Sequence, residues 1–310
     1  MSDSNSKLTP ETFKFRHRLE FTLFNSLKRW GKGASKKTRR RGTILLDGLL
    51  YHGLRICRSI VAINLELAFP KFSTVERKQI ARANYRWFAR FCMDVLHMDA
   101  WKGHTSEIAK CHNLEILDQA LSEKKGVLLI SGHFGNWEMI PPALSELGYP
   151  VTMYVGRQTN LLTNELQNTA RANFGVETID KGKRATLQMG RALAANKIIA
   201  MLIDQNDNKS DLFVNFFEKL ASSSKGTAAF HLLRKSPVVL VTCPYVGDHL
   251  EISFQRITFD LSGEQEKDTL AITQKITSAL ENVIRKYPEQ YFWMHRRWRA
   301  RPQEDPEDIY

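Results

Sequence analysis

A histidine and a glutamate five positions apart, His133 and Glu138, are the side chains best suited by type and spacing to acid–base chemistry. They follow a short apolar run, residues 127–130, with the length and composition of a buried strand, and they precede an apolar segment of helical character, 137–147. In one regular strand the two side chains would point to opposite faces, but across a strand-to-helix turn they can face each other. A carboxylate beside an imidazole raises its basicity, as a general base requires.

The turn itself favours this arrangement. Gly132 and Gly135 supply backbone freedom on either side of His133. Asn136 is predicted to be a helix N-cap, which places Glu138 in the first helical turn, where the helix dipole stabilises a charged carboxylate. The alternative is a structural corner in which His133 caps a helix and Glu138 is solvated. The spacing alone leaves both interpretations open.

The stretch His-Phe-Gly-Asn-Trp-Glu, residues 133–138, resembles the His-x-x-x-x-Asp/Glu motif of the glycerolipid acyltransferase superfamily, in the form found in bacterial lipid A late acyltransferases. That family moves an acyl chain from acyl carrier protein to a hydroxyl of a lipid A precursor. The resemblance implies an O-acyltransferase of lipopolysaccharide biosynthesis that uses no cofactor. Its implied partners are acyl carrier protein, a phosphorylated glycolipid and an anionic membrane surface. In the implied mechanism His133 is the general base and Glu138 orients it.

Two other stretches carry the same resemblance, which covers about residues 13–300 in ordered pieces. Residues 64–70, Asn-Leu-Glu-Leu-Ala-Phe-Pro, match a phrase that precedes the catalytic domain in the family. Residues 290–298 contain the family's C-terminal signature, Trp-x-His-Arg-Arg-Trp, and make His295 a second-line candidate. Without the resemblance, the expectation for this last stretch is a helix that docks its aromatic face on the sheet.

By resemblance, Arg157, Asn160, Arg171 and Asp204 are candidate substrate-binding residues. An arginine can bind a phosphate or a sugar carboxylate, or stabilise the oxyanion of a thioester under attack, and the roles of the two arginines stay unassigned. The alternatives are a surface ion pair for either arginine, and a turn or helix cap for Asp204. The chain departs from the family at Glu218, where glycine is usual, which puts any close backbone approach there in doubt.

The charge of the chain is concentrated at its beginning. The 310 residues carry a net charge of +12, while a hydrophobic share of 43% and a charged share of 25% are ordinary for a soluble globular protein. The first 42 residues contain twelve Lys and Arg against three acids, a net charge of +9. Such a segment suits anionic lipid head groups, nucleic acid or an acidic protein, and the alternative is a solvated basic tail.

Residues 13–30 form a predicted amphipathic helix, with Phe15, Leu19, Leu23 and Leu27 at near-helical spacing and basic residues between them. A basic amphipathic helix of this kind is typical of a protein that lies on a membrane surface, and the alternative is a helix packed on the main domain. The apolar stretch that follows, to residue 67, is interrupted by charges and is a poor spanning helix. We therefore expect peripheral attachment through residues 13–67, at the cytoplasmic face of the inner membrane.

Metal, nucleotide and disulfide chemistry are not indicated. The four cysteines are scattered and lack metal-ligand spacing, and we expect them to be reduced core thiols in a cytoplasmic protein. No secretory signal, phosphate-binding loop, zinc motif or Gly-x-Ser-x-Gly elbow is present. The sequence therefore predicts neither a metal nor a cofactor.

Alternation of helical segments with short apolar runs predicts an α/β fold whose mixed, mostly parallel sheet is flanked by helices and preceded by an N-terminal helical region. The resemblance makes this fold glycerol-3-phosphate acyltransferase-like. The predicted strands are 127–130, 151–155, 176–179, 198–203, 212–216, 238–244 and 250–259. The predicted helices are 13–30, 44–68, 73–97, 114–122, 137–147, 162–173, 185–195, 226–235 and 268–286.

The predicted organisation is a disordered N-terminus (1–12), a basic helical region (13–112), an α/β acyltransferase domain (113–300) and a C-terminal tail (301–310). Sites in such sheets collect at the carboxyl ends of strands, where His133 falls. Two other functions remain open. One is an acyltransferase acting on a lysophospholipid, glycolipid or ornithine lipid, from an acyl carrier protein or acyl-CoA. The other is a non-catalytic protein whose basic arm binds membrane or nucleic acid, although nucleic acid is not an expected partner.

Overall fold

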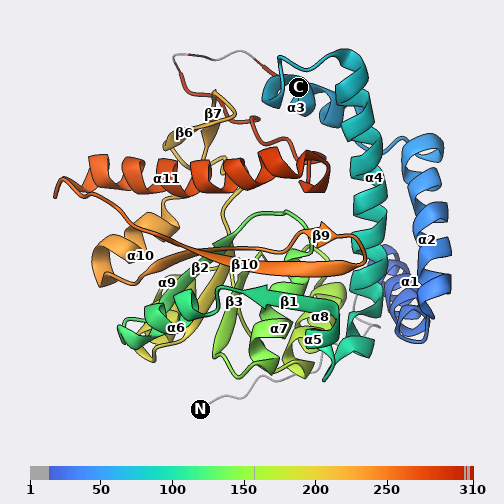
Figure 1. The fold of residues 1–310 in the computed structure, drawn as a ribbon, viewed down its shortest axis with the longest axis horizontal. Helices are drawn as coiled ribbons and strands as arrows, with labels where there is room; N and C mark the ends of the chain where they lie inside the picture. The colour runs from blue at the N-terminus through green and yellow to red at the C-terminus, as the bar shows by residue number, and fades with distance from the viewer. Residues whose placement is uncertain (1–13, 157, 304, 306–307) are drawn as a thin grey trace.

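The computed structural model describes residues 14–156, 158–303, 305 and 308–310, and it is built around one sheet (Figure 1). The order of its strands is β1-β10-β8-β2-β5-β3-β4, with β9 paired to β10. All pairs are parallel except those that β10 makes with β8 and β9. The predicted mixed, mostly parallel sheet is therefore confirmed. The strands are β1 (Ala109–His112), β2 (Val127–Ser131), β3 (Val151–Val155), β4 (Glu177–Asp180), β5 (Ile198–Leu202), β8 (Val238–Thr242), β9 (Tyr245–Val246) and β10 (His249–Ile257).

The central strands are almost entirely apolar because helices cover both faces of the sheet. Every residue of β2 and of β8 is buried. Leu128 and Ile130 pack in one core, with α9 (Ala185–Ala194), α10 (Gly226–Arg234) and α11 (Gln265–Lys286). Val127 and Leu129 face the opposite core, with α6 (Glu115–Ser122) and α7 (Ile140–Glu146). This alternation of faces is what a pleated strand requires.

The N-terminal helices form a layer at one side of the sheet (Figure 1). The long helix α4 (Thr74–His97) begins with a capping box, in which Ser73 and Glu76 exchange hydrogen bonds with each other's backbone. Helices α1 (Phe15–Lys32) and α2 (Lys36–Gly48) pack against α4. Among the described residues, no helix is both long enough and apolar enough to cross a membrane. The disorder predicted for residues 1–12 lies outside the described residues.

The single helix predicted for residues 44–68 is wrong. Helix α2 ends at Gly48, a short π-helix (Leu49–Gly53) follows, and α3 (Arg58–Ala68) starts afresh. Between them, Arg55 and Cys57 adopt φ values of 51° and 54°. Two glycines weaken the helix here, and left-handed residues cannot continue it.

The predicted strand 212–216 exists, but it does not join the main sheet. It forms β6 (Phe213–Phe216), which pairs with β7 (Lys219–Ser222) in a separate hairpin packed on α11. Phe217 and Glu218 make its turn, with φ values of 51° and 62°. Glu218 thus occupies a left-handed position that favours glycine, which is the residue usual in the family. Strands β1, β7 and β9 were not predicted.

The chain after α11 is mostly extended. Apart from a 3-10 turn (Pro288–Gln290), residues 290–298 form no helix, so the docking helix expected for them without the family resemblance is wrong. Trp293 and Trp298 are nevertheless almost completely buried, and Arg297 is 2% exposed. The segment is held by packing and hydrogen bonds to distant parts of the chain, which a local propensity does not reveal.

Candidate active site

His133 lies just beyond the carboxyl end of β2, and its ring is held by Asp204. Its Nδ1 is 2.8 Å from Oδ1 of Asp204, and its backbone N–H donates to Oδ2 of the same carboxylate at 2.8 Å. Asp204 follows β5, which pairs in parallel with β2. Neighbouring parallel strands therefore deliver both groups to the same edge of the sheet. With Nδ1–H donating to the carboxylate, Nε2 keeps its lone pair.

Glu138 has a different partner. It lies in a 3-10 turn (Trp137–Met139), and both of its carboxylate oxygens accept from Nη2 of Arg171, at 2.9 and 3.2 Å. Arg171 comes from α8 (Leu161–Asn173). The orienting contact predicted for Glu138 is thus made by Asp204, while Glu138 acts on His133 only through its charge. Both carboxylates lie close to the imidazole, but only one of them fixes its tautomer.

The turn between β2 and Glu138 depends on one glycine and one buried amide. Gly135 has a φ of 60°, and a Cβ there would collide with the backbone carbonyl of Cys243. Asn136 is fully buried, and its backbone N–H donates to that same carbonyl at 2.7 Å. Asn136 is the residue before the 3-10 turn, but its side chain donates to the Tyr245 hydroxyl instead of capping the turn. The predicted side-chain cap is therefore absent.

Charges around His133 favour its protonated form. Burial lowers the pKa of His133, but the charge and hydrogen bond of Asp204, with the charge of Glu138, outweigh burial and raise the pKa above its ordinary 6.5. Burial in turn raises the pKa of Asp204, while His133 and then Arg297 lower it below its usual value. Asp204 therefore stays ionised, and the imidazole is a stronger base than a free histidine.

An aromatic wall flanks the imidazole. The ring centroids of Trp137 and Phe292 lie 5.1 and 6.0 Å from that of His133, and Phe91 of α4 stacks on Trp137 at 4.0 Å. On the other side the Gln205 amide lies 3.3 Å from Nε2 of His133, in an exposed contact. A base whose free nitrogen lies beside apolar rings and near solvent is suited to a substrate that has both a hydroxyl and a hydrocarbon part.

The C-terminal segment, residues 290–300, joins the two loops that carry His133 and Asp204. On the first loop, Phe292 N–H donates to the His133 carbonyl, and Gly135 N–H donates to the carbonyl of Gln290, both at 2.9 Å. On the second loop, Asn206 makes two bonds of 2.9 Å: its N–H donates to Nε2 of His295, and its side-chain oxygen accepts from Ala300 N–H. The segment is therefore the common support of the His133–Asp204 pair.

The sequence is similar to those of known proteins. Residues 49–300 match the family described as bacterial lipid A biosynthesis acyltransferase. The chain belongs to this family. It is an acyltransferase. It is 27% identical over 252 residues to the lipid A biosynthesis palmitoleoyltransferase of Escherichia coli (strain K12), a match that covers 79% of each chain.

Two further relatives extend this comparison. The lipid A biosynthesis lauroyltransferase of Escherichia coli (strain K12) is 26% identical to the acyltransferase over 254 residues, and the match covers 80% of each chain. The phosphatidylinositol mannoside acyltransferase of Mycolicibacterium smegmatis is 23% identical over 225 residues, covering 71% of this chain and 73% of the relative. Relatives with similar sequence identity to this chain are thus named for different lipids.

The remaining candidates of the acyltransferase have different surroundings. Asn160 is buried and caps α8 by accepting from Leu162 N–H, while its amide donates to the His17 carbonyl and the Glu20 carboxylate of α1. This places Asn160 at a junction between two helices, and none of its bonds reaches the catalytic pair. Arg157 lies outside the described residues. Neither Phe292 nor Arg297 was named as a candidate from the sequence. The C-terminal signature, which contains Arg297, was the signal that could have identified Arg297.

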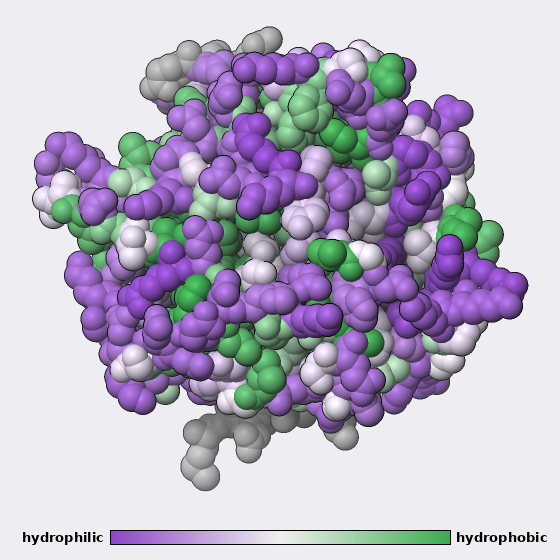
Figure 2. Space-filling view, viewed as in Figure 1, coloured by the Kyte–Doolittle hydropathy of each residue, from purple (hydrophilic) through white to green (hydrophobic). Residues whose placement is uncertain are grey.

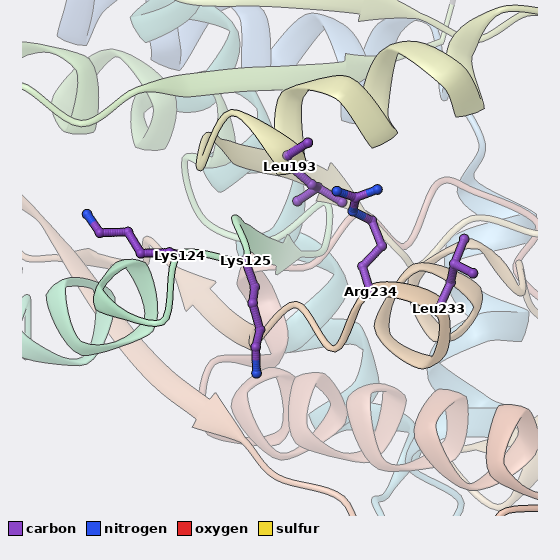
Figure 3. A pocket seen from close by; sticks show the side chains of 6 residues that line it. Lys124, Lys125, Leu193, Leu233 and Arg234 are labelled. Carbon is purple, nitrogen blue, oxygen red and sulfur yellow. The ribbon is translucent and has the colours of Figure 1, made fainter.

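The described part of the acyltransferase holds no group of three or more His, Cys, Asp or Glu residues arranged to bind a metal. A cavity of about 500 Å³ lies elsewhere, lined by Lys124, Lys125, Leu193, Ala194, Leu233 and Arg234 (Figure 3). It opens just before β2, at the edge of the sheet opposite His133. In Figure 3 the two lysines point away from each other and Arg234 lies over Leu193, so the three cations do not converge on one ligand.

Proposed function

We propose that this acyltransferase moves a fatty acyl chain from acyl carrier protein to a hydroxyl of a lipid A precursor, with His133 as the general base. The observation that carries the proposal is the pair formed by His133 and Asp204, which leaves Nε2 without a proton, in a ring that lies beside the aromatic wall and 3.3 Å from the Gln205 amide. Asp204 fixes the tautomer, as the buried carboxylate does in a Ser-His-Asp triad.

In the proposed reaction, Nε2 of His133 takes the proton of the acceptor hydroxyl as its oxygen attacks the thioester carbonyl. The new carbon–oxygen bond forms a tetrahedral intermediate, and its collapse breaks the carbon–sulfur bond. The imidazolium then returns the proton to the leaving thiolate. Asp204 and Glu138 stabilise the imidazolium through their charges, and no covalent acyl-enzyme is required.

The acceptor is proposed to be a phosphorylated glycolipid, because Glu138, whose charge acts on His133, holds a cation. Arg171 is held next to the site by Glu138, and a guanidinium can bind a phosphate or stabilise an oxyanion. A second acceptor class stays open, since one relative is named for a mannoside of phosphatidylinositol. Lysophospholipid, glycolipid and ornithine lipid acceptors, and acyl-CoA as donor, belong to this alternative.

An exposed apolar ridge on α1 supports a membrane-surface location. Its members are spaced along one side of the helix and are 41% to 72% exposed: Phe15, Leu19, Leu23, Leu27 and Trp30. The opposite side of the helix packs on the protein through residues such as Phe21, Phe24, Lys28 and Gly31. The predicted helix is therefore present, and the four apolar residues named for it do not pack on the main domain.

A second apolar group lies on α2 and the π-helix, where Ile44, Leu45 and Leu49 are 50% to 74% exposed. Figure 2 shows hydrophobic atoms over α2 at the right edge of an otherwise largely hydrophilic face. Exposed cations on the same two helices are Arg16, Arg18, Arg29, Lys32, Lys36, Lys37, Arg40 and Arg41. Apolar side chains among cations suit an anionic lipid surface, so we place the enzyme peripherally on the cytoplasmic face of the inner membrane.

The proposal is tested by transfer of a labelled acyl chain from acyl carrier protein to a tetra-acylated lipid A precursor carrying its inner-core sugars. His133→Ala is expected to lower the rate by about 10³- to 10⁴-fold, because the base is lost. His104→Ala is the matched control, since His104 is exposed and paired only with Glu107. Folding of both variants is checked by circular dichroism and thermal unfolding.

Each result decides one part of the proposal. Transfer that His133→Ala leaves intact would keep the reaction and reject the base. Activity only with a lysophospholipid, or only with acyl-CoA, would move the enzyme to the alternative acceptor or donor. Membrane attachment is tested by washing membranes with high salt and with alkali. Protein that leaves only with detergent would reject a peripheral location.

A further inference from the structure

Arg297 is the most deeply buried cation among the described residues. Its side chain is 2% exposed, beneath the aromatic rings of the hairpin and of the C-terminal segment. The other buried cation is Lys28, which pairs with Asp99 at 3.1 Å. Arg297 has no carboxylate within 4 Å in the described part of the chain. A guanidinium taken out of water without a contacting anion is costly, so its presence needs a reason.

The bonds of Arg297 fix it in one place. One terminal nitrogen donates to the Ser222 carbonyl, the other donates to the Ser223 hydroxyl at 2.7 Å, and Nε has no partner. Both serines belong to the end of the β6–β7 hairpin. These neutral acceptors hold the geometry of the guanidinium, but they do not neutralise its charge.

Asp204 lies on the loop that the segment around Arg297 contacts, because Asn206 bonds to both His295 and Ala300 at 2.9 Å. That carboxylate accepts both N–H groups of His133, and Arg297 lies close enough to favour its ionised form. Burial raises the pKa of the Tyr291 hydroxyl, Asp204 raises it further and Arg297 lowers it. Asp204 is thus the carboxylate on which both His133 and Arg297 act.

The charge of Arg297 matters most when His133 is neutral and ready to accept a proton. A general base must be neutral, and a neutral His133 leaves Asp204 as an isolated buried anion. Such an anion is unfavourable, and without compensation the pair would keep its proton. A fixed cation close to the carboxylate weakens that preference.

We propose that Arg297 is a positioning residue whose buried guanidinium is the counter-charge that keeps Asp204 ionised while His133 is neutral. It acts through Asp204 and touches no reacting atom. The inference rests on the proposed role of His133 as a base, but it makes a statement about ionisation that holds whichever acceptor is used.

Other charged and titratable groups surround the pair, and the test must separate them from Arg297. They are Glu138 and Arg171, which pair with each other, and Tyr291 and His295 of the C-terminal segment. Burial lowers the pKa of His295 to about 4, so His295 stays neutral in the range of the measurement. Asn206 N–H donates to its Nε2, which agrees with a neutral ring.

The experiment is a titration of the His133 ring by NMR in the full-length protein, with its signal assigned by its loss in His133→Gln. Arg297→Gln removes the charge and keeps donors for the two serines. It is expected to raise the apparent pKa of the pair by roughly 0.5 to 1 pH unit. Arg297→Lys keeps the charge and is expected to restore most of the shift. Arg296→Gln is the matched control, because Arg296 is exposed.

The acid limb of the pH–rate profile should move upward by the same amount in Arg297→Gln. An unchanged titration midpoint in folded Arg297→Gln would overturn the proposal and leave Arg297 a purely structural residue. The NMR measurement needs no substrate, so a failure of the proposed reaction is distinguishable from a failure of this inference.

If Arg297→Gln does not fold, the proposal is tested with the double variant that combines Arg297→Gln and Asp204→Asn. Removing both charges should restore folding that removal of the cation alone destroys, because no buried anion is then left uncompensated. A double variant that unfolds as completely as Arg297→Gln would overturn the proposal. In folded proteins the same cycle, measured by thermal unfolding, should show a double loss smaller than the sum of the single losses.

Discussion

The centre around His133 and Asp204 and the layer of N-terminal helices distribute polar and apolar groups in opposite ways. At the centre, Asp204 and Arg297 are buried under aromatic rings, although charged side chains normally lie at the surface. On α1 and α2, large apolar side chains face outward in a row, although side chains of this kind normally fill the core. Both regions depart from the usual distribution of side chains: one buries charged groups, and the other exposes apolar groups.

The difference shows what each region exchanges with its surroundings. Buried charges interact strongly with one another because water does not screen them, so the centre can set the ionisation of one imidazole. Exposed apolar groups gain free energy only when something covers them, so the ridge of Phe15, Leu19, Leu23, Leu27 and Trp30 can bind a surface. Mutations should therefore separate chemistry from attachment.

Asp204→Asn should have the largest effect, and only on chemistry. The amide can donate to Nδ1 of His133 and so favour the tautomer whose Nε2 already carries the proton. Acyl transfer is expected to fall by about 10²- to 10⁴-fold, with vesicle binding unchanged. Asp211→Asn is the control, since Asp211 is exposed and pairs with Lys225. A loss of vesicle binding together with activity would mean that the two regions are not separable.

Glu138→Gln should have a smaller effect of a different kind. Glu138 raises the pKa of His133, so its neutralisation lowers that pKa and moves the acid limb of the pH–rate profile to lower pH. The maximal rate is expected to fall by about tenfold to a hundredfold, because Arg171 loses its partner. The pH profile is compared with that of Glu107→Gln, an exposed control. An acid limb that moves upward would contradict the charge assigned to Glu138.

The double variant Leu19→Glu and Leu23→Glu should weaken attachment and spare chemistry. Two partly buried leucines in the lipid interface contribute on the order of 1 kcal/mol each, so binding to anionic vesicles is expected to weaken by about tenfold or more. Activity on a detergent-dispersed acceptor should stay within about twofold. Leu233→Glu is the control, because Leu233 is 79% exposed but belongs to α10, far from α1 in Figure 1. An equal loss of vesicle binding in the double variant and in Leu233→Glu would show that the ridge has no special role in attachment.

Ser73→Ala should change neither function. It removes the capping box of α4, the helix on which α1 and α2 pack, and is expected to lower the free energy of unfolding by about 1 kcal/mol in a denaturant titration. Ser26→Ala, on the exposed side of α1, is the control and should cost nothing comparable. A drop in vesicle binding with Ser73→Ala would show that attachment depends on the stability of α4.

Local pattern was enough to predict much of the fold. Strand β2 and the polar turn after it were predicted because apolar runs, glycines and His133 all lie within ten residues. The π-helix after α2 was not, since the glycines that weaken the helix there were outweighed by the apolar residues between them. Asn160 could have been interpreted as a cap, because it directly precedes a helix, but the family resemblance favoured the site instead.

The proposed catalytic pair depends on strand order, which local pattern does not contain. His133 and Asp204 are separated by 71 positions and meet only because β5 lies next to β2. Glu138, five positions away, was the nearer choice for an orienting carboxylate. The same limit applies to Arg297, whose neighbours come from the hairpin and from Asp204.

The C-terminal segment has a consequence for how the enzyme is made. During translation this segment emerges after every strand of the sheet, the last of which ends at Ile257. A ribosome that stops before Tyr291 therefore releases a chain that has α1, α2 and the whole sheet but lacks the support shared by the two catalytic loops. Such a chain also leaves uncovered the part of the core that Tyr291, Trp293 and Trp298 fill, so a late nonsense mutation removes the support of the two loops and the packing of the core together.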